Sequence, residues 1–530
     1  MSLNSIESQT TPYIDRRVAE GLFRELFGES ATYRVLNIYG KSGSGKTTFV
    51  ENIINKYLQN REDVISIKID FNDRLLHKPQ SAIMHLAKEL EQKYDFNFMA
   101  LWKAYAILWH KRYEHSPLMH AADLPYFHEI KKLINPKKNR NILDIAKGIF
   151  GSKVTKELES IKNEDTKRIE EKLYQFFAAD LHRILKDSKF KDCVIVLENI
   201  DTLGEYNSNT PCSSDAWVRD LITYISKDAM FIITSIEPLN WKRCNQSWGS
   251  VVKSYEMKPF IQKDSLRYLR LSGIKDKNLQ NAIAQSSKGE PFWLSLAVAT
   301  YTIKEPKELP ISKKEILEHF LDSLDRDIVK LLDILAHSRF FTKDLIKTIA
   351  KKFDISIHQH SLLKLLSMPF VKRLDEERYI IDSVLKDRLK ELQSKEDSVE
   401  YLTFMFSYYE NILQSIDTQI VEATPKLVDE AIEEAWYHLN LINSEPLVHF
   451  EWLDYYIDRF FMYAAWEPFL ERYNKIVPKL KKAKDKTSKE KLVSLYNNLA
   501  GLYESLGDTN ISKKYYKMVI KLNRPMALSA

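Results

Sequence analysis

The first 250 residues alternate between short apolar runs, which are typical of strands, and longer helical patterns. Strands are predicted at 35–39, 64–70, 193–197 and 230–235. The run at 64–70 alternates apolar and polar positions, and we expect it to lie beside the strand at 35–39. Helices are predicted between and around the strands, at 13–27, 48–58, 81–94, 153–187 and 215–225. Strands separated by helices indicate an α/β domain with a parallel sheet.

After residue 251 the pattern changes, and we expect the sheet to end there and helices to take over. Helical patterns cover 264–271 and 276–286, and Gly289-Glu290-Pro291 forms a turn that opens another helix. Between 309 and 392, two strand-like runs around Asp375-Glu376-Glu377 predict a hairpin after a triplet of helices. From residue 399 onward the sequence is helical and rich in aromatic residues.

The turn between the first strand and the next helix has the composition of a phosphate-binding loop. Its residues are Gly40, Lys41, Ser42, Gly43, Ser44, Gly45, Lys46, Thr47 and Thr48. Glycines let successive N–H groups point at phosphate oxygens, and the helix start adds its positive dipole. Lys46 is expected to bind the β- and γ-phosphates, and the Thr47 hydroxyl to ligate Mg²⁺. An ordinary Gly/Ser loop is the alternative, but the flanking strand and helix favour binding of ATP or ADP with Mg²⁺.

A second set of polar residues follows the buried strand at 193–197. The tip of such a strand lies at the nucleotide, so Glu198 is expected to hold Mg²⁺ through water. Asn199 cannot accept a proton, which leaves Asp201 as the candidate general base beside Lys46. The strand at 230–235 would place Ser235 near the γ-phosphate as a polar sensor. The alternative is a buried strand that ends in an ordinary polar turn.

Composition adds limits rather than a new function. The 530 residues exceed what one hydrophobic core holds, so three or four domains are expected. A net charge of +6 is mild and requires no nucleic-acid partner. The three cysteines lack CxxC spacing and the N-terminus lacks a signal peptide, which favours a reduced, cytoplasmic protein. No apolar run approaches the roughly 20 residues that span a bilayer.

These motifs resemble the STAND group of AAA-related P-loop ATPases, and especially bacterial members with tetratricopeptide repeats. The resemblance rests on the P-loop, on Glu198 to Asp201 followed by the helix with Trp217, on Ser235-Ile236-Glu237, and on Gly289-Glu290-Pro291. It implies an α/β P-loop NTPase domain with a parallel sheet, an all-α lid, a winged helix and α-helical TPR-like repeats. The expected bounds are 1–250, with a helical insertion at about 95–188, then 251–308, 309–392 and 393–530. It also implies that Pro291 packs on the adenine and that Arg16, in the entry segment, lies near it.

The chain departs from the STAND pattern at the positions that drive hydrolysis. Glu198 replaces the usual magnesium-site aspartate, and Ile236 stands where an arginine often ends the sensor strand. Asp382 stands where the winged helix usually offers a histidine to ADP, and a carboxylate would repel a diphosphate. We therefore expect slow or absent ATP turnover, with Asp201 as the candidate base.

The sequence near the C-terminus fits the 34-residue tetratricopeptide pattern. Its matching positions are Tyr496, Leu499, Ala500, Tyr503, Gly507, Ser512, Tyr516 and Val519, with Pro525 one position late. Residues 452–480 look like a degenerate repeat packed by Trp466 and Phe469. An isolated helical hairpin is the alternative. Repeat arrays form concave surfaces that bind proteins or peptides, and this is the partner that we expect.

Three other kinds of site are disfavoured. The histidines 110, 115, 120 and 128 do not share one helical face and have no nearby cysteine, which argues against zinc. The lysine-rich run at 479–491 is diluted by acidic residues and is typical of a solvated linker. The candidate recognition helix at 362–367 has Lys364 as its only basic residue, which argues against nucleic-acid binding.

Together these patterns favour a regulated nucleotide switch, in which ATP and ADP stabilise different arrangements of lid, winged helix and repeats. By resemblance, its setting is bacterial signalling or defence against phage. No effector domain is visible in the sequence, so the output would be homo-oligomerisation or a separate protein. The competing hypotheses are a non-hydrolysing, nucleotide-bound TPR scaffold and a winged-helix transcription regulator.

Overall fold

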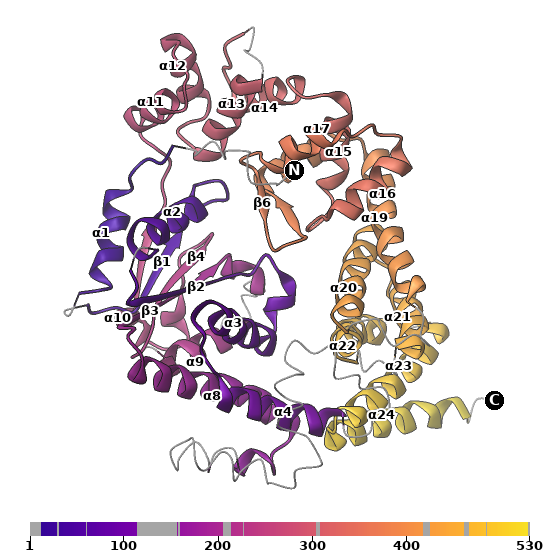
Figure 1. Cartoon of the computed structure of the whole chain (residues 1–530). Coiled ribbons are helices and arrows are strands. Elements are labelled where there is room, and N and C mark those ends of the chain that lie inside the picture. The colour runs from indigo at the N-terminus through magenta and orange to yellow at the C-terminus, as the bar shows by residue number, and fades with distance from the viewer. Residues whose placement is uncertain are drawn as a thin grey trace. The chain divides into compact units, whose positions relative to one another are not determined.

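The computed structural model places the chain in two compact units. The first unit comprises residues 1–90 and 185–398, and the second comprises 91–184 and 399–530. The described residues are 12–28, 31–59, 61–113, 156, 159–204, 214–225, 227–303, 308–416, 425–460, 466–483 and 485–527. Figure 1 labels most of their helices and strands, and each unit is described by itself below.

The first unit is built on a five-stranded parallel sheet (Figure 1). Its strands are β1 (Val35–Tyr39), β2 (Val64–Asp70), β3 (Asp192–Glu198), β4 (Met230–Ser235) and β5 (Val252–Glu256). They lie in the order β2-β3-β4-β1-β5. The two central strands that the sequence predicts as apolar runs, β3 and β4, are almost completely buried. The parallel sheet confirms the predicted α/β fold class.

The structure corrects two predictions about this sheet. The strand at 64–70 does not lie beside the P-loop strand, because β4 and β5 flank β1 and β2 pairs with β3 at the sheet edge. The sheet also does not end at residue 251, since β5 pairs parallel with β1 in the register Val35↔Val252. The residues of β5 are polar and partly exposed, so backbone hydrogen bonds define this strand without an apolar signal in the sequence.

One face of the sheet packs against two helices that frame the P-loop. These are α1 (Arg17–Glu25) and α2 (Lys46–Ile53), which a π-helical turn extends through Leu58. Leu36 and Ile38 of β1 contribute to this core from alternate positions, as expected for one face of a strand. Phe23 of α1 and Phe49 of α2 fill the same core. This packing fixes the start of α2 directly after β1.

The remaining elements of the first unit are mostly helical. They are α3 (Pro79–Tyr94), α9 (Ala216–Ile225), α10 (Trp248–Val251), α11 (Gln262–Leu271), α12 (Lys277–Ser286), α13 (Pro291–Ile303), α14 (Lys313–Asp322), α15 (Arg326–Leu335), α16 (Lys343–Phe353), α17 (Gln359–Leu366) and α18 (Ser383–Leu392). Between α17 and α18, β6 (Val371–Arg373) and β7 (Tyr379–Ile381) form the predicted antiparallel hairpin. Phe341, just before α16, forms an isolated antiparallel bridge with Tyr379 of this hairpin.

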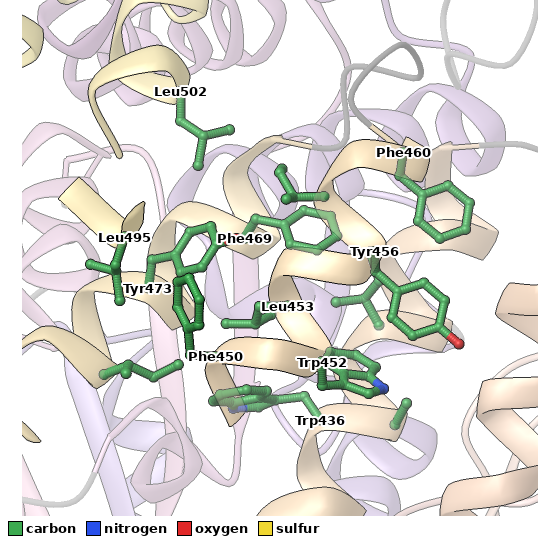
Figure 2. Close-up of a cluster of buried hydrophobic side chains, with 14 of the residues drawn as sticks. Trp436, Phe450, Trp452, Leu453, Tyr456, Phe460, Phe469, Tyr473, Leu495 and Leu502 are labelled. Atoms are coloured by element: carbon green, nitrogen blue, oxygen red, sulfur yellow. The ribbon is translucent and has the colours of Figure 1, made fainter. Parts of the chain in front are cut away.

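The second unit is helical throughout its described residues. Its helices are α4 (Met99–Tyr113), α8 (Thr166–Asp187), α19 (Lys395–Ser415), α20 (Pro425–Ile442), α21 (Pro446–Phe460), α22 (Trp466–Lys482), α23 (Lys486–Ser505) and α24 (Thr509–Ala527). A continuous buried cluster joins α19 to α24, and Figure 2 shows its centre around Trp436, Trp452 and Tyr473. Large aromatic side chains therefore fill the space between successive helices, as the aromatic-rich sequence predicts.

The last helical hairpin has the features predicted for a tetratricopeptide repeat. Ala500 and Ser512 are both buried, which lets α23 and α24 approach closely. Gly507 adopts a positive φ of 80° in the turn between the helices. Tyr503 and Tyr515 stack with ring centroids 5.7 Å apart. The helix α24 continues to Ala527, so Pro525 does not end it.

The insertion and the repeats belong to the same unit. Thr166, at the start of α8, donates a hydrogen bond from its hydroxyl to the Leu506 carbonyl oxygen at 3.2 Å. Leu506 lies directly after α23, so this contact reaches the turn of the last repeat. Most of the insertion between α4 and α8 lies outside the described residues, and so do the candidate zinc histidines at 115, 120 and 128.

Asp180 of α8 is buried beneath the start of α4. Its carboxylate accepts hydrogen bonds from the backbone N–H groups of Ala100 and Leu101 at 2.7 and 3.0 Å. Arg183 Nη2 lies 3.3 Å from the same carboxylate. Burial raises the pKa of Asp180 from 3.8 to about 6, although these donors oppose the shift. The carboxyl therefore holds α4 against α8 while remaining costly to ionise.

Replacing Asp180 with asparagine is expected to flatten the pH dependence of stability. The pKa of Asp180 is higher in the folded state than in the unfolded state. The protonated carboxyl therefore contributes its full stabilisation below about pH 4, and this contribution is lost as pH rises through about 6. Asparagine keeps an acceptor for the two N–H groups but has no charge to desolvate. The free energy of unfolding of Asp180→Asn, compared with that of wild type, should increase between about pH 4 and 7, by up to about 3 kcal/mol. Urea unfolding at several pH values measures this gain.

The matched control for this experiment is Asp187→Asn, at the exposed end of the same helix. It should keep the wild-type pH profile. An unchanged profile in Asp180→Asn would show that the buried carboxyl does not govern the slope.

Among the described helices, none is both long and apolar enough to cross a membrane. Cys193 has a free, buried thiol, but Cys244 is disulfide-bonded.

Candidate nucleotide-binding site

The P-loop forms a tight turn between β1 and α2. Gly43 and Gly45 have φ values of 75° and 88°, a region that L side chains rarely adopt. Gly45 is the residue that precedes the first turn of α2, so the loop ends on the helix N-terminus. Lys41, Ser42 and Thr48 are exposed, and Thr47 is half-buried in the first turn. This geometry presents backbone N–H groups and a helix dipole at one place, as an anion site requires.

Lys46 lies along the loop rather than in solvent. Its Nζ donates to the carbonyl oxygens of Gly40 at 2.5 Å and Lys41 at 3.2 Å. Burial lowers the pKa of Lys46, while the nearby carboxylates of Asp201, Asp382 and Glu198 act to raise it. The loop therefore positions one ammonium group where phosphate oxygens would meet it.

Among the described residues, two buried oxygen atoms at the site have neither a hydrogen-bond partner nor an ion-pair partner. They are the hydroxyl of Ser44 in the loop and Oε1 of Glu198 at the end of β3. Unpaired buried oxygens are rare because they lose hydration without compensation. A nucleotide phosphate and a hydrated Mg²⁺ ion have the chemistry to satisfy them, with Thr47 and Glu198 as the protein residues that would hold the ion. The residues present therefore fit the expected ligand.

The acidic side of the site is already engaged by other groups. Glu198 is completely buried, and Lys68 Nζ of β2 lies 2.9 Å from its Oε2. Asp201 Oδ2 accepts a hydrogen bond from Ile236 N at 2.7 Å. Burial raises the pKa of Asp201, although this N–H group and Lys46 oppose the shift. Asp201 thus joins the end of β3 to the end of β4.

Ser235 is placed inside the sheet. Its hydroxyl accepts a hydrogen bond from Asn37 Nδ2 at 2.7 Å and donates to the Glu237 carbonyl at 2.7 Å. The neighbouring Thr234 hydroxyl accepts the Asn199 N–H at 2.9 Å. Asn199 itself is held in a left-handed conformation with φ 57°. These hydroxyls align the strand ends, and both side chains are buried.

The start of α13 rests on the P-loop. Pro291 Cγ would lie 3.5 Å from a methyl group placed on Gly45, and Phe292 N donates to the Gly43 carbonyl oxygen at 3.1 Å. Gly289 is required beneath this turn, because a methyl group on it would lie 2.0 Å from the Phe260 carbonyl oxygen. The Gly-x-Pro turn was recognisable in the sequence. The contact of Phe292 with the P-loop was not, because no sequence pattern indicates it.

Arg16 lies beside the turn that precedes α13. Its Nη1 donates to the Lys258 carbonyl oxygen at 2.8 Å, and its guanidinium lies 4.1 Å from the centre of the Phe260 ring. Burial lowers the pKa of Arg16. The entry segment is therefore tied to the chain that follows β5, beside the Gly289 turn.

The hairpin region also reaches the P-loop. A methyl group on Gly43 would lie 3.2 Å from Val384 Cγ2, in the first turn of α18. The Asp382 carboxylate caps this helix by accepting the Val384 N–H at 2.9 Å, and its charge acts on Lys46. Arg378 of the hairpin binds Asp73, which follows β2, with distances of 2.5 and 3.3 Å. No local pattern in the sequence indicates this ion pair.

Comparisons with known proteins agree with the geometry of the site. Residues 22–209 match the family described as the KAP family P-loop domain. No curated protein matches the chain.

Within the part of the chain that the structure describes, no group of histidine, cysteine and acidic residues is arranged to hold a metal ion by itself.

Three solved structures have similarity to this chain at low sequence identity. One is a signal transduction ATPase with numerous domains (STAND) and a tetratricopeptide repeat sensor from Pyrococcus horikoshii, with 12% identity over 99% of this chain and 67% of that chain, at a TM-score of 0.43. The Walker-type ATPase of Pyrococcus abyssi has 14% identity over 72% of this chain and 97% of that chain, at a TM-score of 0.32. Drosophila ORC bound to DNA has 9% identity, 72% and 97% coverage, and a TM-score of 0.23.

The family match includes β1, the P-loop, β2 and β3, and so it contains both Lys46 and Glu198. The parallel sheet and the glycine-rich turn before α2 have the arrangement that such a domain requires. Residues 22–209 of this chain therefore match a P-loop NTPase domain in both sequence and strand arrangement, and a domain of this kind implies nucleotide binding.

Proposed function

We propose that this protein is a STAND-type nucleotide switch, in which ATP or ADP with Mg²⁺ at the P-loop controls the arrangement of the neighbouring domains. In this proposal residues 251–308 are the lid and 309–392 the winged helix. The order of helices and hairpin between α15 and α18, with the bridge from Phe341 to Tyr379, supports the winged-helix assignment. The helical repeats after residue 393 bind a protein or peptide partner.

One observation carries the proposal. Phe292 N of α13 donates to the Gly43 carbonyl oxygen in the P-loop, and a methyl group on Gly43 would lie 3.2 Å from Val384 Cγ2 of α18. A phosphate group bound to the loop therefore changes the surface on which both helices rest. A ligand shifts a conformational equilibrium only through different interactions with its two states, and these contacts supply that difference.

Hydrolysis is the weaker part of the activity. Asp201 is engaged by the Ile236 N–H, and Glu198 is engaged by Lys68. A general base must be free to approach the attacking water. We therefore propose slow turnover at most, and these engagements favour a non-hydrolysing TPR scaffold as the second candidate. In a cellular setting, signalling or defence against phage with output by oligomerisation remains our proposal.

The test combines nucleotide binding with hydrogen exchange on the full chain. Titration with a fluorescent ATP analogue should give saturable binding that Lys46→Ala abolishes and Lys253→Ala, an exposed lysine on β5, leaves unchanged. ATP and ADP should protect the starts of α13 and α18 to different extents. Phosphate release should be slow and should disappear in Asp201→Asn.

Two results would contradict the switch. Binding of wild-type strength in Lys46→Ala would remove the P-loop from the mechanism. Equal protection of α13 and α18 with and without bound nucleotide would instead favour the scaffold, in which nucleotide is a passive structural ligand.

A further inference from the structure

The pairing of Lys68 with Glu198 brings a fixed positive charge to the place where a metal-ion ligand is expected. In the register of β2 and β3, Asp70 lies opposite Glu198, so Lys68 is two residues earlier on the same strand. Its Nζ reaches Glu198 Oε2 at 2.9 Å. The Glu198 side chain is 0% exposed, whereas that of Lys68 is 39% exposed.

A second carboxylate strengthens this placement of Lys68. Glu51 Oε1, on α2, lies 3.9 Å from Lys68 Nζ. The ammonium group of Lys68 therefore lies between two carboxylates. It bridges the first helix after the P-loop and the tip of β3.

Glu198 needs a counter-charge whether or not nucleotide is bound. A buried, ionised carboxylate without a partner is strongly destabilising, by about 3–5 kcal/mol when a buried partner is removed. In a P-loop site this carboxylate ordinarily serves a hydrated Mg²⁺ ion, which also neutralises the phosphates. Here Lys68 neutralises Glu198 from within the chain. A divalent ion that used Oε2 would have to displace the ammonium group.

Further lysine charge surrounds the P-loop. Lys372 of β6 acts electrostatically on both Lys46 and Glu51. Lys46 and Lys372 thus supply positive charge near the P-loop, while Lys68 offsets the charge of Glu198. Phosphate binding that is driven by fixed cations does not require a metal ion to offset the phosphate charge.

We propose that Lys68 is the built-in counter-cation of Glu198 and makes nucleotide binding by this chain independent of Mg²⁺. This inference rests on the proposed function, because it presupposes that the P-loop binds nucleotide. In this proposal, Lys68 determines whether nucleotide binding depends on a metal ion.

The test is an ATP titration of the full chain in EDTA and in excess Mg²⁺, read by calorimetry or by a fluorescent analogue. Wild-type affinity should change by less than about threefold between the two conditions. Lys68→Met should lose about tenfold or more in EDTA and recover in Mg²⁺, because the ion then takes the place of the ammonium group. Lys68→Arg keeps the charge and should behave as wild type. Lys253→Met, an exposed lysine at the opposite sheet edge, is the matched control.

A double variant covers the case in which Lys68→Met fails to fold. Lys68→Met with Glu198→Gln removes both charges of the pair, so no buried carboxylate is left uncompensated. It should fold and bind ATP equally well in EDTA and in Mg²⁺. A tenfold gain with Mg²⁺ in the double variant would overturn the assignment of metal dependence to this pair.

The remaining outcomes separate this inference from the proposed function. If wild type loses about tenfold in EDTA and Lys68→Met loses the same, Lys68 does not replace the ion, and the switch proposal stands. If wild type binds no ATP in either condition, the proposed function itself fails.

Discussion

Arg378→Ala is expected to lower the free energy of unfolding by about 3–5 kcal/mol and to release the hairpin of β6 and β7 from the sheet domain. Arg378 binds Asp73 through two nitrogen atoms, at 2.5 and 3.3 Å, and its Nε donates to Asp375 at 2.7 Å. The side chains of Arg378 and Asp73 are only 8% and 12% exposed. Alanine leaves the Asp73 carboxylate buried without its counter-charge, which is the costly step.

Denaturant unfolding measures the stability loss, and hydrogen exchange locates it. Exchange should accelerate in 371–381 and at the start of α18, because Val384 follows the hairpin and contacts Gly43. The matched control is Arg373→Ala in the same hairpin, an exposed arginine that donates to the carbonyl oxygens of Asp375 and Glu376. Its effect should stay within about 1 kcal/mol.

A double-mutant cycle tests whether Asp73 is the partner that matters. Arg378→Ala combined with Asp73→Ala should cost less than the sum of the single changes, because no buried charge remains unpaired. Strict additivity would mean that the ion pair does not hold the hairpin, and its loss would then have another cause.

Gly289→Ala is expected to displace the start of α13 from the P-loop and to weaken nucleotide binding. Gly289 has φ 72°, and a methyl group there would lie 2.0 Å from the Phe260 carbonyl oxygen. Phe260 N also donates to the Gly289 carbonyl at 2.8 Å, so the two chain segments are already in direct contact. Neither segment can yield without moving Pro291 and Phe292, which rest on Gly45 and Gly43.

Gly273→Ala separates backbone strain from steric displacement. Gly273 has φ 90° but no atom within 4 Å of the added methyl group. Its substitution should cost about 1–2 kcal/mol, the strain of a left-handed residue alone. Gly289→Ala should cost clearly more in thermal unfolding and should lower ATP affinity, which Gly273→Ala should leave unchanged. Equal effects of both substitutions on stability and affinity would mean that the Phe260 contact is not needed for the site.

Local signals were sufficient for the elements that carry the nucleotide site. The P-loop is recognisable because its chemistry needs glycine, lysine and threonine at fixed spacing between a strand and a helix. The strands β3 and β4 were predictable because full burial demands an apolar run. The helical hairpin from α23 to α24 followed from small residues at Ala500 and Ser512, which the close approach of two helices requires.

The tertiary structure alone decided which polar groups meet. Lys68 and Glu198 are joined by the pairing of β2 with β3, and β2 was expected beside another strand. Arg378 and Asp73 lie 305 residues apart, so no local pattern connects them. The strand β5 has no apolar signal and exists through its hydrogen bonds to β1.

By itself, the sequence determined that this chain has a phosphate-binding loop, a buried acidic strand tip and a helical remainder, since each depends on residues close together in the chain. The tertiary structure decided that Glu198 faces a lysine, that Asp201 holds Ile236, and that α13 and α18 both rest on Gly43. The reason is physical. Periodicity and spacing report which side chains are buried, whereas the charge environment of a site depends on strand register and domain packing, which distant residues set together.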